Sequence, residues 1–226
     1  MFYFDPTYLI FAIPGLLLAM WAQWKVQSTF NKYAQVPTQN GVNGVQTAQT
    51  LINRNALQVG VTSIAGQLTD HYDPGSKTVA LSQSSQQNSV ASVAVVAHEL
   101  GHAMQDKENY GPLKLRGAIV PAVQISGTVG PIMFLIGLLL NVGILQTLGL
   151  VAFGLAALFA LITLPVEFDA SHRALVMLQQ NNLLEGQELR GAKAVLDAAA
   201  LTYVAAAAQA VTQLLYYVML SGRRRN

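Results

Sequence analysis

The residues best suited to chemistry lie in one short run of the chain, Val95-Val96-Ala97-His98-Glu99-Leu100-Gly101-His102-Ala103-Met104. His98 and His102 are four residues apart, so on a helix both imidazoles face the same side and can bind one ion. Glu99 follows the first histidine, where its carboxylate can reach a metal-bound water without being a ligand. Zinc peptidases use this His-Glu-x-x-His arrangement, and the apolar, proline-free flanks predict that it lies on an uninterrupted helix.

A catalytic zinc site usually has three protein ligands and a water, so the motif still lacks one ligand. The chain has no cysteine, which leaves His71, His172 and the acidic residues outside the helix. Two of these acids, Glu167 and Asp169, directly follow a long apolar stretch. On a helix, Asp169 lies about 200° around the axis from Glu167 and His172 about 140°, so the three side chains cannot all face one ion. The spacing alone leaves the choice open.

Much of the chain outside this motif is apolar. Of the 226 residues, 52% are hydrophobic and 11% are charged, with a net charge of +2, whereas about 25% of an average soluble domain is charged. Three stretches contain no Asp, Glu, Lys or Arg: Pro6 to Trp24, Gly117 to Val166 and Ala198 to Gly222. Each is at least as long as the ~17–25 residues of a bilayer-spanning helix. This composition excludes an ordinary soluble domain and a disulfide-stapled secreted chain, and it predicts an integral membrane protein.

Four membrane spans are predicted from these stretches. The first lies at about Tyr8–Gln23 and the last at roughly Leu201–Leu220. The middle stretch is long enough for two crossings, Pro121–Leu140 and Ile144–Leu164, and Asn141-Val142-Gly143 supplies the turn between them.

The polar region between the first two spans, Lys25 to Arg116, is predicted to hold the site. Apolar residues at helical spacing predict a helix over Val45–Leu57. Two short β-branched runs, Val59–Ile64 and Thr78–Ser82, lie on either side of a turn at His71-Tyr72-Asp73-Pro74-Gly75 and predict a small sheet or hairpin. We hypothesise that the strand Thr78–Ser82 offers an edge with which an extended peptide can pair.

The sequence thus predicts a mainly α fold: a four-helix integral membrane protein with a small α+β zinc-peptidase domain at the membrane surface. The His-Glu-x-x-His helix builds that domain together with a glutamate-bearing helix, which the family resemblance of this chain implies. If Glu167 is the third ligand, a shared ion requires it and His98 on the same side of the membrane, and the two crossings between them allow this. The predicted segments, in chain order, are an N-terminal transmembrane helix (1–24), a polar catalytic region (25–117), a transmembrane hairpin of two spans (118–164), a helix with the third zinc ligand (165–197), and a C-terminal transmembrane helix with a basic tail (198–226).

Four stretches of the chain carry a family resemblance. They are Thr69-Asp70-His71-Tyr72-Asp73-Pro74, Ala97-His98-Glu99-Leu100-Gly101-His102-Ala103, Leu164-Pro165-Val166-Glu167-Phe168-Asp169-Ala170-Ser171 and Asp197-Ala198-Ala199-Ala200-Leu201-Thr202-Tyr203-Val204-Ala205. The sequence resembles the YugP-like family of membrane neutral zinc metallopeptidases, and the match covers nearly the whole chain. The resemblance implies His98, His102 and Glu167 as the ligands of one Zn²⁺, and Glu99 as the general base.

The resemblance extends more distantly to other, gluzincin-like membrane zinc peptidases, in which a glutamate from a later helix completes the site. Those relatives carry Asp four residues after the ligand glutamate, where this chain has Ser171. Asp169 therefore stays a second candidate for the third ligand.

The function implied is that of a membrane-embedded zinc-dependent endopeptidase acting on a peptide or membrane-protein substrate. Zinc would lower the pKa of a bound water toward ~7, and Glu99 would take the proton and pass it to the leaving amine. His172 and Arg173 are candidates for stabilising the oxyanion. The alternative is a non-hydrolytic zinc-binding membrane chaperone or sensor, because a motif indicates a site but not turnover.

The other expected partner is the lipid bilayer. The run Arg223-Arg224-Arg225 is short and adjoins a span, so lipid headgroups rather than nucleic acid are its expected partner. Basic residues near membrane ends are more numerous on the side of the motif, which favours a cytoplasmic active site under the positive-inside rule. We expect the protein in a prokaryotic cell (inner) membrane.

Overall fold

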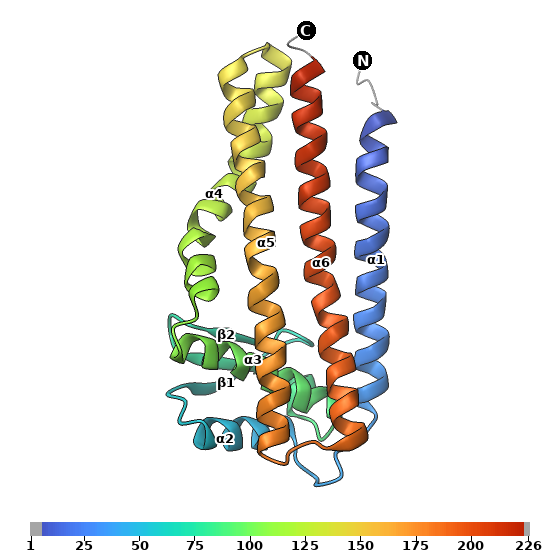
Figure 1. The fold of residues 1–226 in the computed structure, drawn as a ribbon, viewed down its shortest axis with the longest axis vertical. Coiled ribbons are helices and arrows are strands. Elements are labelled where there is room, and N and C mark those ends of the chain that lie inside the picture. Colours follow the sequence, from blue (N-terminus) through green and yellow to red (C-terminus); the bar gives the residue numbers. More distant parts are fainter. Residues whose placement is uncertain (1–5, 224–226) are drawn as a thin grey trace. The chain divides into compact units, whose positions relative to one another are not determined.

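The computed structural model describes residues 6–223 and is mainly helical, as predicted. Its helices are α1 (Pro6–Ala34), α2 (Gly44–Arg54), α3 (Val90–Lys107), α4 (Gly111–Leu140), α5 (Gly143–Gln180) and α6 (Gly186–Arg223), and its strands are β1 (Gly60–Ile64), β2 (His71–Asp73) and β3 (Thr78–Ser82) (Figure 1). A short 3₁₀ turn covers Gln83–Gln86. Residues 1–5 of the first predicted segment, and Arg224 and Arg225 of the predicted basic tail, lie outside the described residues.

Within the described residues, four helices are long and apolar enough to cross a membrane: α1, α4, α5 and α6. This agrees with the predicted number of spans. The helices are longer than the charge-free stretches, because neither glycine nor proline interrupts residues 25–34 or 166–180. The predicted segment 165–197 belongs to two helices, since α5 ends at Gln180 and α6 begins at Gly186.

The chain forms two compact units. The helical unit contains the described parts of residues 1–22, 114–164 and 202–226, and the α/β unit contains residues 23–113 and 165–201. Glycine allows close packing inside the helical unit: a Cβ at Gly149 would lie 2.5 Å from the Cβ of Phe134. Small residues at such contacts let membrane helices approach closely.

The sheet of the α/β unit has the strand order β1–β3–β2. β1 pairs with β3 in parallel, so the two predicted strands do not form a hairpin. β2 pairs antiparallel with β3, with Tyr72 opposite Val79. His71 to Asp73 were expected in a turn and instead form this strand, while the turn follows at residues 74–77. The hypothesis that Thr78–Ser82 offers a free edge is wrong, because both edges of β3 are paired.

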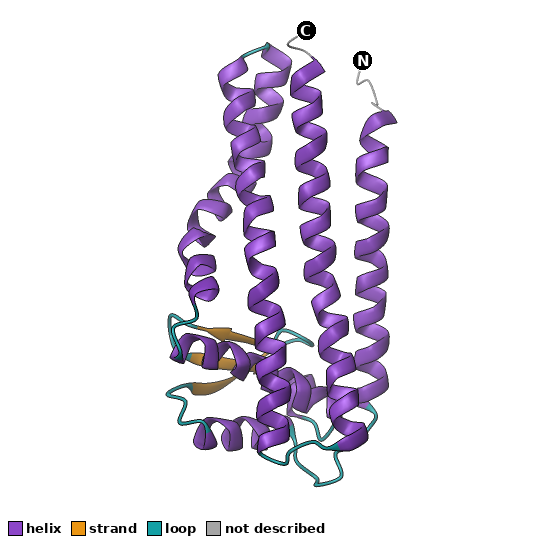
Figure 2. Cartoon of the chain, viewed as in Figure 1, coloured by secondary structure: helices purple, strands orange, loops and turns teal. Residues whose placement is uncertain are grey.

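α3 lies at the centre of the hydrophobic core of the α/β unit, and Figure 2 shows it beside the three strands. Ser89 caps its first turn by accepting a hydrogen bond from the backbone N–H of Ser92. The core residues that surround α3 come from the other elements of the unit: Ala48 and Leu51 of α2, Val79 and Leu81 of β3, Ala174 and Leu178 of α5, and Ala192 and Leu196 of α6. This packing fixes the helix that carries the motif.

Candidate metal centre

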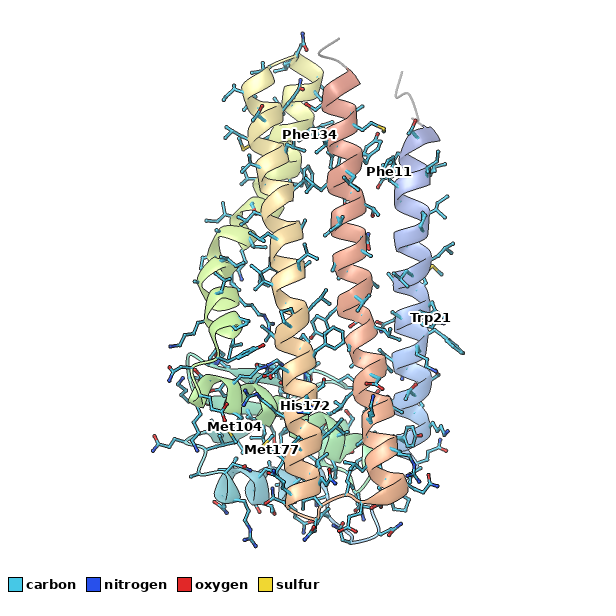
Figure 3. The ribbon with its side chains drawn as sticks, viewed as in Figure 1. Phe11, Trp21, Met104, Phe134, His172 and Met177 are labelled. Atoms are coloured by element: carbon cyan, nitrogen blue, oxygen red, sulfur yellow. The ribbon has the colours of Figure 1, made fainter. Side chains whose placement is uncertain are left out.

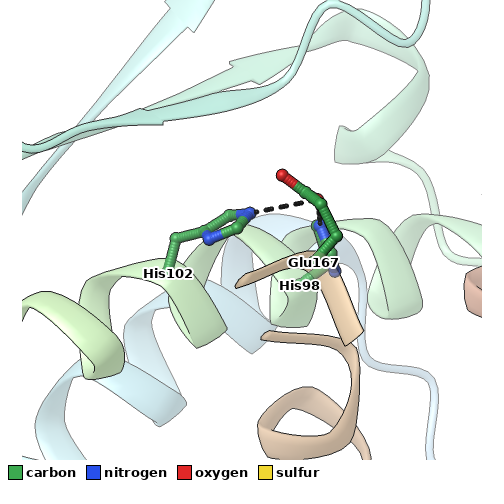
Figure 4. A group of neighbouring side chains, drawn as sticks. All are labelled: His98, His102 and Glu167. Carbon is green, nitrogen blue, oxygen red and sulfur yellow. Dashed lines mark hydrogen bonds and ion pairs between the residues drawn. The ribbon is translucent and has the colours of Figure 1, made fainter. Parts of the chain in front are cut away.

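α3 presents both motif histidines on one face, and α5 brings Glu167 to them (Figure 4). The imidazole centroids of His98 and His102 are 4.8 Å apart, and the rings are inclined at 81°. Glu167 Oε2 lies 3.2 Å from His98 Nε2 and 3.5 Å from His102 Nε2. Each of these three side chains, from two helices, therefore places one donor atom close to the other two.

The two helices meet closely at a glycine of the motif. A Cβ added at Gly101 would lie 2.4 Å from the carbonyl oxygen of Ala170. Backbone atoms of α5 occupy the space that any larger residue at position 101 would need. Gly101 thus permits the approach that brings Glu167, three residues before Ala170, to the histidines.

The donor atoms fit a zinc ion. Ligands at about 2.0–2.1 Å from zinc in tetrahedral geometry are roughly 3.3 Å from one another. The two distances from Glu167 bracket this value, and the three donor atoms all lie within 4.8 Å of one another. Two imidazoles and one carboxylate are also a donor set that catalytic zinc sites use.

The group is buried, and its charges interact. Glu167 is 2% exposed, His102 8% and Glu99 9%. Burial alone lowers the pKa of His102, but the hydrogen bond to Glu167 and the charges of Glu99 and Glu167 raise it above its ordinary value overall. A buried carboxylate requires a compensating cation, and a metal ion bound by these residues would supply one.

Glu99 points toward the sheet rather than into the group of three. Its Oε2 accepts a hydrogen bond of 2.9 Å from the backbone N–H of Tyr72 on β2. The phenol of Tyr72 donates to Asp106 in the last turn of α3. Burial raises the pKa of this phenol, and the hydrogen bond to Asp106 raises it further. Tyr72 therefore fixes the edge strand against the helix at two points.

The other candidate ligands lie apart from this group. Asp169 Oδ2 accepts hydrogen bonds from Gln105 and from Arg173, and Arg173 also pairs with Glu108. His172 is exposed on α5 (Figure 3). His71 is exposed on β2, with its Nδ1 3.0 Å from the carbonyl oxygen of Thr69.

The second ring nitrogen of each histidine also has a partner. Ser171 Oγ lies 3.2 Å from His98 Nδ1, and Gln105 Oε1 lies 3.0 Å from His102 Nδ1. Ser171 stands where the more distant relatives carry Asp, and it contacts His98 through a neutral hydroxyl group. Gln105, Tyr72 and Gly101 were not predicted to contribute to the site. For Gln105, the only signal in the sequence was its position three residues after His102. A glutamine exposed to solvent could have the same spacing.

The fold and the site define a class of protein: a helical membrane chain with a His-Glu-x-x-His helix and a buried glutamate from a later helix. Comparison with known proteins gives the family. Residues 8–222 match the family described as "Putative neutral zinc metallopeptidase", and the chain belongs to this family. It is 43% identical over 223 residues to "Putative membrane protease YugP" of Bacillus subtilis (strain 168), covering 97% of this chain and 99% of that protein. No solved structure matches the chain.

Proposed function

We propose that this protein is a membrane-embedded, zinc-dependent endopeptidase in which His98, His102 and Glu167 hold one Zn²⁺. The observation that carries the proposal is the convergence of these three donor atoms. Membership of a zinc metallopeptidase family supports the choice of zinc, and the similarity to a membrane protease supports peptide-bond hydrolysis. Four apolar helices support a place in a membrane.

Zinc bound there would lower the pKa of a water ligand and polarise the scissile carbonyl. Glu99 would accept a proton from the attacking water and donate it to the leaving amine. The hydrogen bond from the backbone N–H of Tyr72 holds the Glu99 carboxylate, whose charge acts on His102. Arg173 is paired with both Asp169 and Glu108, which favours a role in holding those carboxylates over stabilising an oxyanion.

The edge of β2 that faces away from β3 pairs with no other strand among the described residues, and it is the proposed binding surface for an extended peptide. Tyr72 directs its N–H away from β3 and toward Glu99. In an antiparallel pair the N–H and C=O of one residue point to the same side, so the Tyr72 carbonyl also faces this edge. It would accept a hydrogen bond from the backbone of a substrate that lies alongside Glu99.

We further propose that the substrate is a peptide or a membrane protein, and that the lipid bilayer is the second partner. The similarity to a membrane protease of Bacillus subtilis supports a prokaryotic cell (inner) membrane. The distribution of basic residues near membrane ends supports a site on the cytoplasmic side.

The test is a comparison of wild type with Glu99→Gln in detergent. Cleavage of a fluorescent unfolded protein and zinc content are measured on the same samples. We expect about one zinc per chain in both, and a loss of roughly 10²–10⁴-fold in cleavage rate for the variant. Full activity in Glu99→Gln would refute the general-base role. Zinc without cleavage in the wild type would favour the non-hydrolytic chaperone or sensor.

A further inference from the structure

Gln105 is a fully buried amide between the two helices that carry the candidate ligands. Its exposed fraction is 0%. Its Oε1 lies 3.0 Å from His102 Nδ1, and its Nε2 lies 2.7 Å from the carbonyl oxygen of Val166 and 2.8 Å from Asp169 Oδ2. Val166 immediately precedes Glu167. One side chain of α3 thus contacts one candidate ligand and the backbone beside another.

The partners of Gln105 determine which way its amide faces. The Val166 carbonyl can only accept a hydrogen bond, and so can the Asp169 carboxylate, which Arg173 also binds. Two acceptors on one side require the NH₂ group there. The amide oxygen must then face His102, and an oxygen can only accept, so His102 Nδ1 carries the proton.

This arrangement has a consequence for the metal site. A neutral imidazole with its proton on Nδ1 has a free lone pair on Nε2, the nitrogen that faces Glu167. We propose that Gln105 is a positioning residue that holds His102 in its metal-binding tautomer and ties it to the backbone next to Glu167. The inference rests on the proposed zinc site and adds a residue that acts through a ligand rather than on the metal.

A chain of polar groups continues outward and holds the amide in place. Asp169, which accepts from Gln105, also accepts from Arg173 Nε, and Arg173 Nη1 donates to Glu108 at the end of α3. The charge of Asp169 is therefore balanced by Arg173. Both ends of this network join α3 to α5. A displaced Gln105 would therefore change the orientation of His102 and the position of Glu167 at the same time.

The first experiment measures zinc affinity of the purified full-length protein in detergent, by competition with a chromogenic chelator. Gln105→Leu keeps the approximate volume and removes the amide. We expect a zinc dissociation constant weakened by roughly 10- to 100-fold, the usual effect of losing a partner of a ligating histidine. Gln146→Leu is the matched control, because Gln146 is also buried and donates to a backbone carbonyl, of Gly137, inside the helical unit. Its affinity should equal that of the wild type.

A rescue experiment separates positioning from a merely structural role, and it remains informative if Gln105→Leu does not fold. In Gln105→Glu the new carboxylate can still accept a hydrogen bond from His102 Nδ1. It cannot donate to the Val166 carbonyl or to the Asp169 carboxylate, so acceptor oxygens face one another there. Adding Asp169→Asn restores a donor opposite the new carboxylate. We expect weakened zinc binding in the single variant, recovery to within a few-fold of the wild type in the double variant, and a parallel recovery of the visible absorption spectrum with Co²⁺ as a probe.

The outcomes distinguish this inference from the proposed function. Wild-type zinc affinity in Gln105→Leu, or equal affinity in Gln105→Glu and the double variant, overturns the role of Gln105 and leaves the zinc site intact. A wild type that binds no zinc overturns both. Zinc binding that depends on Gln105 in a protein without peptidase activity supports the positioning role and counts against the endopeptidase.

Discussion

Glu167 and Asp169 are two residues apart on α5 and have different partners. Glu167 faces both imidazoles, whereas Asp169 accepts hydrogen bonds from Gln105 and Arg173. The sequence, through its family resemblance, could favour Glu167 as the third ligand and keep Asp169 as the second candidate. It could not fix the rotation of α5 about its axis, because that rotation depends on packing against α3.

The two carboxylates should therefore differ in their effect on zinc content. We expect Glu167→Gln to lose most of the bound zinc, because the variant replaces a charged ligand with a neutral amide. Asp169→Asn should keep about one zinc per chain, since its side chain does not face the imidazoles. Metal analysis of the purified proteins checks this. Zinc lost in Asp169→Asn and kept in Glu167→Gln would reassign the third ligand.

Tyr72 gives a prediction about pH. The pKa of its phenol is raised by burial and by Asp106, so the folded state favours the neutral phenol. This stabilisation is fully present below the unfolded-state pKa of 10.0 and is lost as the pH rises through the raised folded-state value. Tyr72→Phe should lower the free energy of unfolding by about 1–2 kcal/mol at pH 8, with a smaller difference above about pH 10. Denaturant unfolding of both proteins in detergent at several pH values measures this difference in the free energy of unfolding. A constant difference up to pH 11 would contradict this prediction.

At the scale of elements, the contact between α3 and α5 depends on the glycine of the motif. A methyl group at position 101 meets the carbonyl of Ala170, and neither backbone can move without displacing its helix. We expect Gly101→Ala to cost about 1–3 kcal/mol in stability and to weaken zinc binding, because Glu167 would shift away from the histidines. Thermal unfolding and chelator competition test both effects.

Gly117→Ala is the control for this variant. Gly117 also lies within a helix, but a Cβ there would have nothing within 4 Å. Alanine has the higher helix propensity, so the control should be neutral or slightly stabilising. Equal stability and zinc affinity in the two variants would show that the close approach at Gly101 does not matter.

The small sheet shows where prediction from sequence stops at this scale. The β-branched runs indicated β1 and β3, and the apolar periodicity indicated α2, because these signals are local. β2 contains only His71, Tyr72 and Asp73, followed by Pro74 and Gly75, so local composition indicates a turn. Its strand conformation depends on pairing with β3 across the short turn and on the hydrogen bond from Tyr72 to Glu99, and the composition of these three residues indicates neither contact.

At the scale of the whole molecule, the number of spans could be predicted because long charge-free stretches have few alternatives to crossing a membrane. The continuity of the helices could not, since it depends on polar residues whose helical conformation is stabilised by tertiary packing. α5 illustrates this: one helix contains both the apolar residues 144–164 and the polar end that presents Glu167.

The arrangement of spans gives a last prediction, for which the absence of cysteine is an advantage. Single cysteines are introduced at three exposed positions. Gln67→Cys lies between β1 and β2, Gln187→Cys lies in the first turn of α6, and Gly143→Cys lies at the first residue of α5, where a side chain has open space. Two crossings between Gln67 and Gln187 require that they be labelled from the same side and Gly143→Cys from the other.

In intact cells an impermeant maleimide should label only Gly143→Cys if the site faces the cytoplasm. Labelling of only Gln67→Cys and Gln187→Cys would reverse the orientation but keep the site. Labelling of Gln67→Cys and Gln187→Cys from opposite sides would contradict the metal centre itself, because His98 and Glu167 could not then share an ion.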